Sequence, residues 1–197
     1  MDKIKNIFSN SIKLKIACID EGFGSLVRMG DAIVNTIENG GKLLICGNGG
    51  SAADAQHLVA ELVVRLRPTV NRRGLPAISL AMDISTITAC SNDYNYNMLF
   101  SRTLESIGSS GDCLLGITTS GNSQNIYNAM ELAKKMSIRT FGFLGAGGGK
   151  VFKLCDEAFL VPSNETGRIQ ECHITAGHAL MEHIEDKLIE KKYMKLQ

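Results

Sequence analysis

An excess of charge of one sign is absent from this 197-residue sequence, in which 21 Lys and Arg residues face 20 Asp and Glu residues for a net charge of +1 at pH 7. Proteins that attract nucleic acid or anionic lipid over a distance need a surface with one dominant sign. We therefore expect no nucleic-acid partner and no membrane partner. Any phosphate group that binds here must be held by a local site.

Paired cysteines and long apolar runs are also absent. The 6 cysteines include no CxxC pair, and several lie in short apolar segments, so we expect small buried side chains in a reducing compartment rather than disulfides or zinc ligands. The first 15 residues mix charged and apolar side chains, which is typical of neither a signal peptide nor a membrane span. Together these absences predict a cytoplasmic protein.

Apolar segments of strand length alternate with segments of helix length along most of the chain. Strands are predicted at 42–46, 76–81, 113–118, 139–145 and 157–162, with helices at 51–66, 84–107, 123–136 and 167–192. Because parallel strands need helix-length crossovers, this pattern predicts an α/β fold with a five-stranded parallel sheet covered by helices on both faces. Nothing divides the chain, so we expect a single domain over 1–197.

Two further helices are predicted before the first strand, at 3–19 and 22–39, because apolar residues recur there every three or four positions. These helices have no strand of their own to cover. Two interpretations are open. The apolar faces of residues 1–40 pack against another subunit, or the two helices fold back onto their own domain.

Two turns rich in glycine and hydroxyl groups follow predicted strands. The first, GNGGSA at 47–52, lets the backbone approach a ligand closely and places Ser51 where it can cap a helix. The second, TTSGNS at 118–123, offers several hydroxyl groups at a strand-to-helix junction. Ligands of open α/β sheets collect at such junctions, where helix N-termini favour anions. Either turn alone is compatible with a structural role, but both in one sheet favour a phosphorylated small molecule.

Glycine-rich segments also raise the question of nucleotide binding. GNGGSA loosely fits the dinucleotide pattern, but no acidic residue stands about 20 positions further on at a second strand end. GAGGGK at 145–150 departs from the phosphate-loop pattern at both ends. We therefore set nucleotides aside and keep a dinucleotide-dependent oxidoreductase only as an alternative.

Candidates for acid, base and metal chemistry lie on two predicted helices. His57 and Glu61 are four residues apart on the helix that leaves the first turn, so both project from one face. Gln170 and His178 are eight residues apart on the last helix, about 80° around its axis, and can share a broad face. Such a set can bind a divalent metal such as zinc. A His–Glu pair at this spacing is also common on plain helix surfaces, so both interpretations are open.

Other polar residues carry weaker signals. Asn92 and Asp93 lie in the cluster CSNDYNYN, where they either hydrogen-bond sugar hydroxyls or only form a turn. His173 and His183 share the face of His178 poorly, so we expect structural roles for them.

Four motifs in a consistent order resemble the sedoheptulose-7-phosphate isomerases, or phosphoheptose isomerases, of the sugar isomerase (SIS) domain superfamily. They are GNGGSAADAQH with Glu61 following, SND at 91–93, TTSGNS at 118–123 and RIQECHITAGH at 168–178. The resemblance implies a five-stranded SIS sandwich and a homotetramer with flanking helices at its interfaces and active sites shared between subunits. It also implies conversion of sedoheptulose 7-phosphate to D-glycero-D-manno-heptose 7-phosphate, the entry to the ADP-heptose of bacterial lipopolysaccharide.

The resemblance also assigns roles to particular residues. Glu61 and His178 match the catalytic pair of the family, and one zinc ion per subunit would be bound by His57, Glu61, Gln170 and His178. The positions that match substrate contacts are Asn48, Gly49, Gly50, Ser51, Glu61, Asn92, Asp93, Thr118, Thr119, Ser120, Ser123 and Gln170. Several relatives carry an acidic residue shortly before RIQE, where this chain has Thr166 and Gly167, so a ligand contact from that side chain is absent here.

Two questions stay open within the resemblance. The superfamily includes non-catalytic regulators, among them a DnaA-binding replication initiation factor that lacks the acid at the position of Glu61 and the histidine at that of His178, both of which this sequence keeps. A carboxylate bound tightly to metal is also a poorer base. Either Glu61 binds zinc through one oxygen and takes a proton with the other, or the metal is partly structural.

Overall fold

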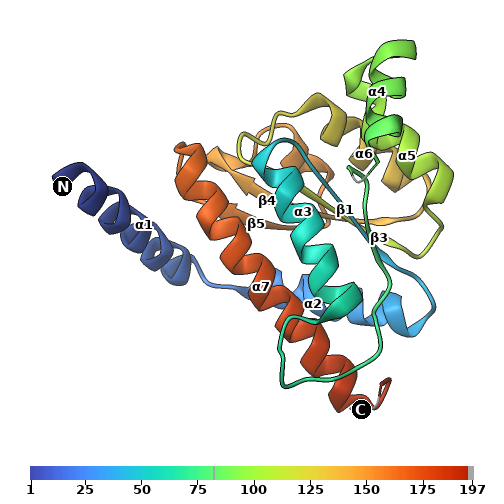
Figure 1. Cartoon of the computed structure of the whole chain (residues 1–197), viewed down its shortest axis with the longest axis horizontal. Coiled ribbons are helices and arrows are strands. Elements are labelled where there is room, and N and C mark those ends of the chain that lie inside the picture. The colour runs from blue at the N-terminus through green and yellow to red at the C-terminus, as the bar shows by residue number, and fades with distance from the viewer. Residues whose placement is uncertain (82, 195–197) are drawn as a thin grey trace.

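A computed structural model describes residues 1–81 and 83–194 (Figure 1). The strands are β1 (Leu43–Gly47), β2 (Ala77–Ser79), β3 (Cys113–Thr118), β4 (Arg139–Gly145) and β5 (Glu157–Val161). They form one 5-stranded sheet in the order β2-β1-β3-β4-β5, and every neighbouring pair is parallel. The predicted sheet is confirmed.

Helices cover both faces of the sheet. One face carries α2 (Gly24–Glu38), α3 (Gly50–Ala60) and α7 (Thr166–Glu190), and the other α4 (Ile84–Asp93), α5 (Leu99–Ile107) and α6 (Gln124–Lys135). Successive side chains of a strand point to opposite faces, so in β1 Ile45 lies in one core while Leu44 and Cys46 lie in the other. This is why the strands are apolar throughout rather than alternating.

Two predicted helices differ from the observed ones. The prediction of one helix over 84–107 is wrong, because a 3₁₀ turn at Tyr96–Met98 separates α4 from α5. Asn95 before this turn has an extended backbone, and its side chain accepts a hydrogen bond from the N–H of Asn97 at 3.0 Å; such local bonds compete with helix formation. The helix predicted at 51–66 is α-helical only as far as Ala60, and it continues as a π-helical turn at Glu61–Arg65.

The two opening helices behave differently from each other. α2 buries Met29, Ile33 and Ile37 in the core on its own sheet, so the fold-back alternative holds for it. α1 (Asp2–Glu21) extends away from the sheet (Figure 1) and leaves Ile4, Phe8 and Ile12 exposed, at 64%, 69% and 59%. For α1, packing against another subunit stays a prediction.

The cysteines are free thiols, and all but the half-buried Cys155 are buried, as predicted. Burial raises the pKa of the Cys46 and Cys155 thiols to about 12, so these groups stay protonated at neutral pH and are poor nucleophiles. Within residues 1–81 and 83–194, no helix is long and apolar enough to cross a membrane.

Candidate active site

The two hydroxyl- and glycine-rich turns lie side by side at one edge of the sheet. β1 and β3 are parallel neighbours, with Gly47 paired to Ile117, so their carboxyl ends meet at the same edge. The side chains of Asn48 and Asn125 join the two turns, because each amide donates to the oxygen of the other at 2.9 Å. The predicted positions of both turns at neighbouring strand ends are confirmed, and phosphate binding there stays a prediction.

The second turn is held in a tight conformation by its own hydroxyl groups. Thr118 Oγ1 and Ser123 Oγ lie 3.1 Å apart, and Ser120 Oγ accepts a hydrogen bond from the N–H of Asn122 at 3.1 Å. Gly121 has φ +65°, and a Cβ there would lie 2.0 Å from the carbonyl oxygen of Gly148. Only glycine fits a left-handed position with backbone so close.

The backbone of the GAGGGK segment at 145–150 packs closely against this turn. Gly148 in that segment is the residue that approaches Gly121, and a Cβ at the preceding Gly145 would lie 2.7 Å from the carbonyl oxygen of Thr119. The N–H of Val151 donates to the carbonyl of Gly121 at 3.0 Å. These contacts explain the run of glycines without a nucleotide.

The first turn leads directly into α3. Gly49 has φ +56°, and Ser51 is buried in the first turn of the helix. A Cβ at Gly50 would lie 2.7 Å from Nε2 of Gln170, so the Gln170 amide rests against the backbone at the start of α3. Helix N-termini carry a partial positive charge that stabilises anions. Both turns therefore offer an anion a place at the same sheet edge.

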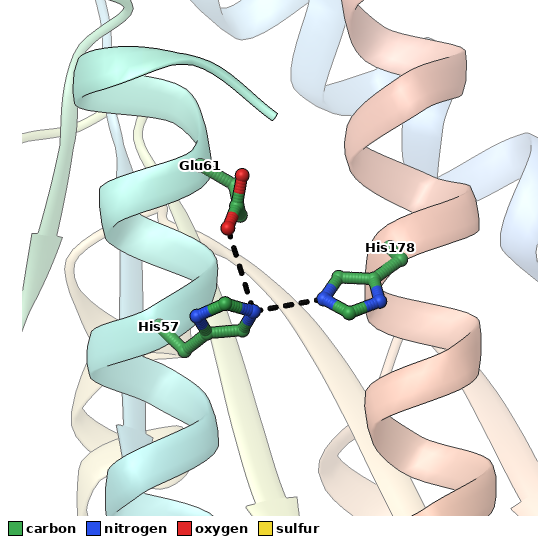
Figure 2. A group of neighbouring side chains, drawn as sticks. All are labelled: His57, Glu61 and His178. Carbon is green, nitrogen blue, oxygen red and sulfur yellow. Dashed lines mark hydrogen bonds and ion pairs between the residues drawn. The ribbon is translucent and has the colours of Figure 1, made fainter. Parts of the chain in front are cut away.

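Two turns further along α3, three ionisable side chains meet (Figure 2). The Nε2 atoms of His57 and His178 lie 2.8 Å apart, and Glu61 Oε1 lies 3.4 Å from His57 Nε2. One ligand atom from each residue lies within 4.8 Å of the others. α3 and α7 run side by side from the same edge of the sheet (Figure 1), which brings together residues that the sequence could only place on separate helices.

Gln170 lies on the same helix as His178 and reaches the first turn. It stands eight residues before His178 on α7, a rise of about 12 Å along a helix, and its amide contacts Gly50 at the beginning of α3. The structure thus brings together three of the four residues assigned to zinc by resemblance. The place of Gln170 in the metal site stays a prediction, and its contact with the first turn suits a substrate-binding role.

The three-residue cluster fits a divalent metal ion chemically. Two imidazoles and a carboxylate are ligands that zinc accepts. Two ring nitrogens facing each other at 2.8 Å need a proton or a cation between their lone pairs.

Asp54 adds a residue that the sequence analysis missed. Its Oδ2 atom is buried and finds no hydrogen-bond partner in the described part of the chain. Burial raises the pKa of this carboxyl, while the neighbouring His57 and His178 lower it. A cation in the cluster would supply the charge that this buried oxygen lacks. The available signal was spacing, because Asp54 precedes His57 by one helical turn.

The segment 92–97 contains two predicted substrate contacts, Asn92 and Asp93, which stay predictions, and one residue that contacts the first turn. Asn92 and Asp93 are exposed at the end of α4, where the Asn92 amide donates to the Asp93 carboxylate at 2.8 Å. Tyr96 instead reaches back, and its hydroxyl donates to Asn48 Oδ1 at 2.6 Å. Tyr96 and Asn125 therefore orient Asn48 from two sides. Neither was singled out, since each contact joins segments far apart in the sequence.

The other two histidines lie outside the cluster, as predicted. His173 is fully buried, with its ring centroid 5.8 Å from that of Phe143 and 6.5 Å from that of Phe159, and burial lowers its pKa to about 4. His183 Nε2 lies 3.0 Å from Asp31 Oδ1 between α7 and α2.

The sequence and the fold are similar to those of known proteins. A family model described as SIS domain matches residues 8–145. The phosphoheptose isomerase of Aquifex aeolicus is 44% identical over 191 residues, which are 97% of this chain and 99% of that protein. That of Paramagnetospirillum magneticum is 50% identical over 169 residues, covering 86% of this chain and 85% of the relative.

Solved structures agree with the sequence relatives. A phosphoheptose isomerase from Neisseria gonorrhoeae superposes with a TM-score of 0.88 at 35% identity, covering 94% of this chain and 98% of that one. One from Francisella tularensis gives a TM-score of 0.89 at 36% identity, covering 94% and 97%. The chain belongs to the phosphoheptose isomerase family of SIS-domain proteins.

Proposed function

We propose that this chain interconverts sedoheptulose 7-phosphate and D-glycero-D-manno-heptose 7-phosphate, in the synthesis of ADP-heptose for lipopolysaccharide. The observation that carries the proposal is the meeting of Glu61, His57 and His178 within 4.8 Å, on the two helices that begin at the anion-binding edge of the sheet. The names of the relatives agree with it. An aldose–ketose isomerase needs this combination of a base, an acid and a phosphate site.

The substrate phosphate would bind where the two turns meet. Ser51, Thr118, Thr119, Ser120 and Ser123 supply hydroxyl groups there, with Gly49 and Gly50 allowing close approach. His57 stands seven residues after Gly50, a rise of about 10 Å along α3. This separation suits an elongated substrate whose phosphate is held at one end while its reacting carbons reach the cluster. Phosphate binding then contributes remote binding energy that positions the reacting carbons.

Proton transfer is assigned to two side chains. Glu61 takes a proton from the carbon beside the carbonyl and returns it to the neighbouring carbon, with a cis-enediol between the two steps. His178 moves the proton at the substrate oxygen or assists ring opening. Positioned acids and bases of this kind contribute about 10²- to 10⁴-fold in rate, and Asn48, Asn92, Asp93 and Gln170 would orient the sugar hydroxyls.

We assign one zinc ion per subunit to His57, Glu61 and His178, with Gln170 as the further ligand that the resemblance implies. A bound zinc ion would polarise the substrate carbonyl and stabilise negative charge on its oxygen. The donor set and the unpartnered Asp54 oxygen support this assignment. His57 and His178 would each offer a ring nitrogen to this ion, from α3 and α7 respectively.

We infer a homotetramer, the assembly that the family resemblance implies, and the exposed face of α1 supports a subunit interface there. Ile4, Phe8 and Ile12 bury less than half of their surface in a lone chain, and large exposed apolar patches mark interfaces. An apolar groove of about 480 Å³ between α1, α2 and α7 offers matching surface on a second copy. This assembly would place α1 between subunits. Six cysteines that form no disulfide support a cytoplasmic location.

Turnover of sedoheptulose 7-phosphate by the purified protein tests the proposal. Formation of the aldose phosphate, lost with a chelator and restored by zinc, is the expected result. A protein that binds the sugar phosphate without turnover, with or without zinc, would instead be a regulator of the non-catalytic type.

A further inference from the structure

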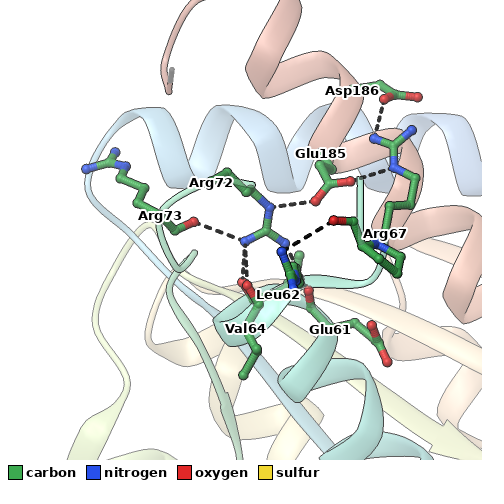
Figure 3. A network of polar contacts seen from close by, with 10 residues as sticks. Glu61, Leu62, Val64, Arg67, Arg72, Arg73, Glu185 and Asp186 are labelled. Atoms are coloured by element: carbon green, nitrogen blue, oxygen red, sulfur yellow. Dashed lines mark hydrogen bonds and ion pairs between the residues drawn. The ribbon is translucent and has the colours of Figure 1, made fainter. Parts of the chain in front are cut away.

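Arg72 is a fully buried arginine that the reaction does not use directly (Figure 3). Its side chain and that of Glu185 are each 1% exposed, and Arg72 Nε donates to Glu185 Oε1 at 2.6 Å. The rest of the guanidinium faces the end of the helix that carries Glu61. Nη2 donates to the carbonyl oxygen of Glu61 at 2.9 Å, and Nη1 donates to that of Leu62 at 2.8 Å.

These carbonyl groups lie in the last turns of the helix that carries Glu61. The last carbonyls of a helix lack intrahelical donors and carry partial negative charge. Here the helix also widens into the π-helical turn Glu61–Arg65, a geometry that is rare and costs regular hydrogen bonds. The guanidinium fork donates to the carbonyls of Glu61 and Leu62 at once and places a positive charge at the helix end, and the Leu62 carbonyl also accepts the N–H of Leu75 at 3.0 Å. Arg72 thereby sets where the backbone of Glu61 lies.

The other end of this contact lies on the helix that carries His178. Glu185 follows His178 by seven residues on α7, so the two side chains share one face. α7 therefore meets the α3 helix twice, through His178 beside His57 and through Glu185 by way of Arg72. The second contact fixes the spacing of the helices next to Glu61.

We propose that Arg72, held by Glu185, is a positioning residue that sets the placement of Glu61 relative to His57 and His178. This inference rests on the proposed isomerase function. Reacting groups displaced by about 1 Å lose roughly 10²-fold in rate, and residues that orient metal ligands are worth about 10- to 100-fold in metal affinity. Both effects are expected when the guanidinium fork is lost.

Arg72→Lys is the direct test, because lysine keeps the charge beside Glu185 but cannot reach both carbonyls in a planar fork. We expect kcat for sedoheptulose 7-phosphate to fall about 10- to 100-fold with KM nearly unchanged. Zinc affinity, measured by competition with a chromophoric chelator in the absence of substrate, should fall about 10-fold or more.

Arg67→Gln is the matched control. Arg67 donates to the second oxygen of the same carboxylate, Glu185 Oε2, at 2.6 Å and pairs with Asp186, but its recorded bonds are to carboxylates rather than to the turn. Because Arg67 does not bind the carbonyls of the π-helical turn through these bonds, this variant should keep kcat and zinc affinity within about threefold of the parent protein.

A second variant separates positioning from stability. Removing one partner of a buried ion pair strands a charge, whereas replacing both by apolar residues is often neutral for folding. Arg72→Leu combined with Glu185→Leu should therefore fold but keep the losses in kcat and zinc affinity. Equal kcat and zinc affinity in this double variant and the parent protein would overturn the inference, as would Arg72→Lys matching Arg67→Gln. An inactive parent protein would instead overturn the proposed function, and the zinc affinities would still decide the role of Arg72.

Discussion

The Nε2 atoms of His57 and His178 lie 2.8 Å apart although 121 residues separate the two histidines in the sequence. The packing of α7 against α3 makes this contact. A Cβ at Gly177, the residue before His178, would lie 2.6 Å from the side chain of Leu58, the residue after His57. A glycine at this crossing therefore lets the helices approach closely enough for the two imidazoles to meet.

The His57→Ala variant tests the metal assignment. Its imidazole is half exposed, at 47%, so its loss should change the melting temperature little. Because one of three converging ligands disappears, zinc per subunit should drop well below one after dialysis against a weak chelator. Elemental analysis of the parent protein and the variant measures this directly. His183→Ala, which removes a histidine outside the cluster, is the control, and equal zinc content in His57→Ala would reject the ligand assignment.

Replacement of Gly121 by alanine tests the role of the TTSGNS turn. The left-handed φ costs an alanine roughly 1–2 kcal/mol, and the Cβ would also meet the Gly148 carbonyl at 2.0 Å. We expect KM to rise at least 10-fold because the turn must shift. Gly111→Ala is the control, since Gly111 also has a left-handed φ of +90° but nothing lies within 4 Å of its Cβ position. Steady-state kinetics should find its KM unchanged; similar KM values for both variants would count against a phosphate site here.

Stability at acid pH should depend on His173. Burial lowers its pKa to about 4 from 6.5, so the folded state favours the neutral ring. The stabilisation is complete above pH 6.5 and is lost as the pH falls from 6.5 toward 4. At about 1.4 kcal/mol per pH unit this amounts to roughly 3 kcal/mol.

The measurement is the urea unfolding free energy at pH 7 and pH 4.5 for the parent protein and His173→Phe. The phenylalanine removes the titrating group but keeps an aromatic ring beside Phe143 and Phe159. The variant should lose less free energy of unfolding between the two pH values than the parent protein does. An equal loss in both proteins would assign the acid sensitivity to other groups.

The sheet and most helices could be predicted from sequence because their patterns are local. A strand buried on both faces must be apolar along its length, as Leu43–Gly47 and Cys113–Thr118 are. The break between α4 and α5 was missed because Asn95 caps the short turn through its side chain, a local choice that apolar periodicity does not report.

The site was predictable only in its parts. The spacing of His57 and Glu61 placed them on one face of a helix, but their approach to His178 depends on how two distant helices pack. Tyr96 and Arg72 act through contacts with segments far from them in the chain, and Asp54, one helical turn from His57, joins the cluster only because His178 packs beside it. In the sequence, Asp54 looks like an ordinary helix residue, Tyr96 like a loop residue and Arg72 like a surface charge. The family resemblance supplied residue roles that pattern alone left open.

The most direct test of the account compares Glu61→Gln with the parent protein in one experiment, with sedoheptulose 7-phosphate as substrate and zinc in excess. The amide keeps the shape of the side chain but cannot accept the substrate proton. The account predicts that binding of the sugar phosphate, followed by calorimetry, stays within a few-fold, while kcat falls about 10²- to 10⁴-fold. Turnover by Glu61→Gln at the parent rate would contradict it, because the proton would then be carried by another group.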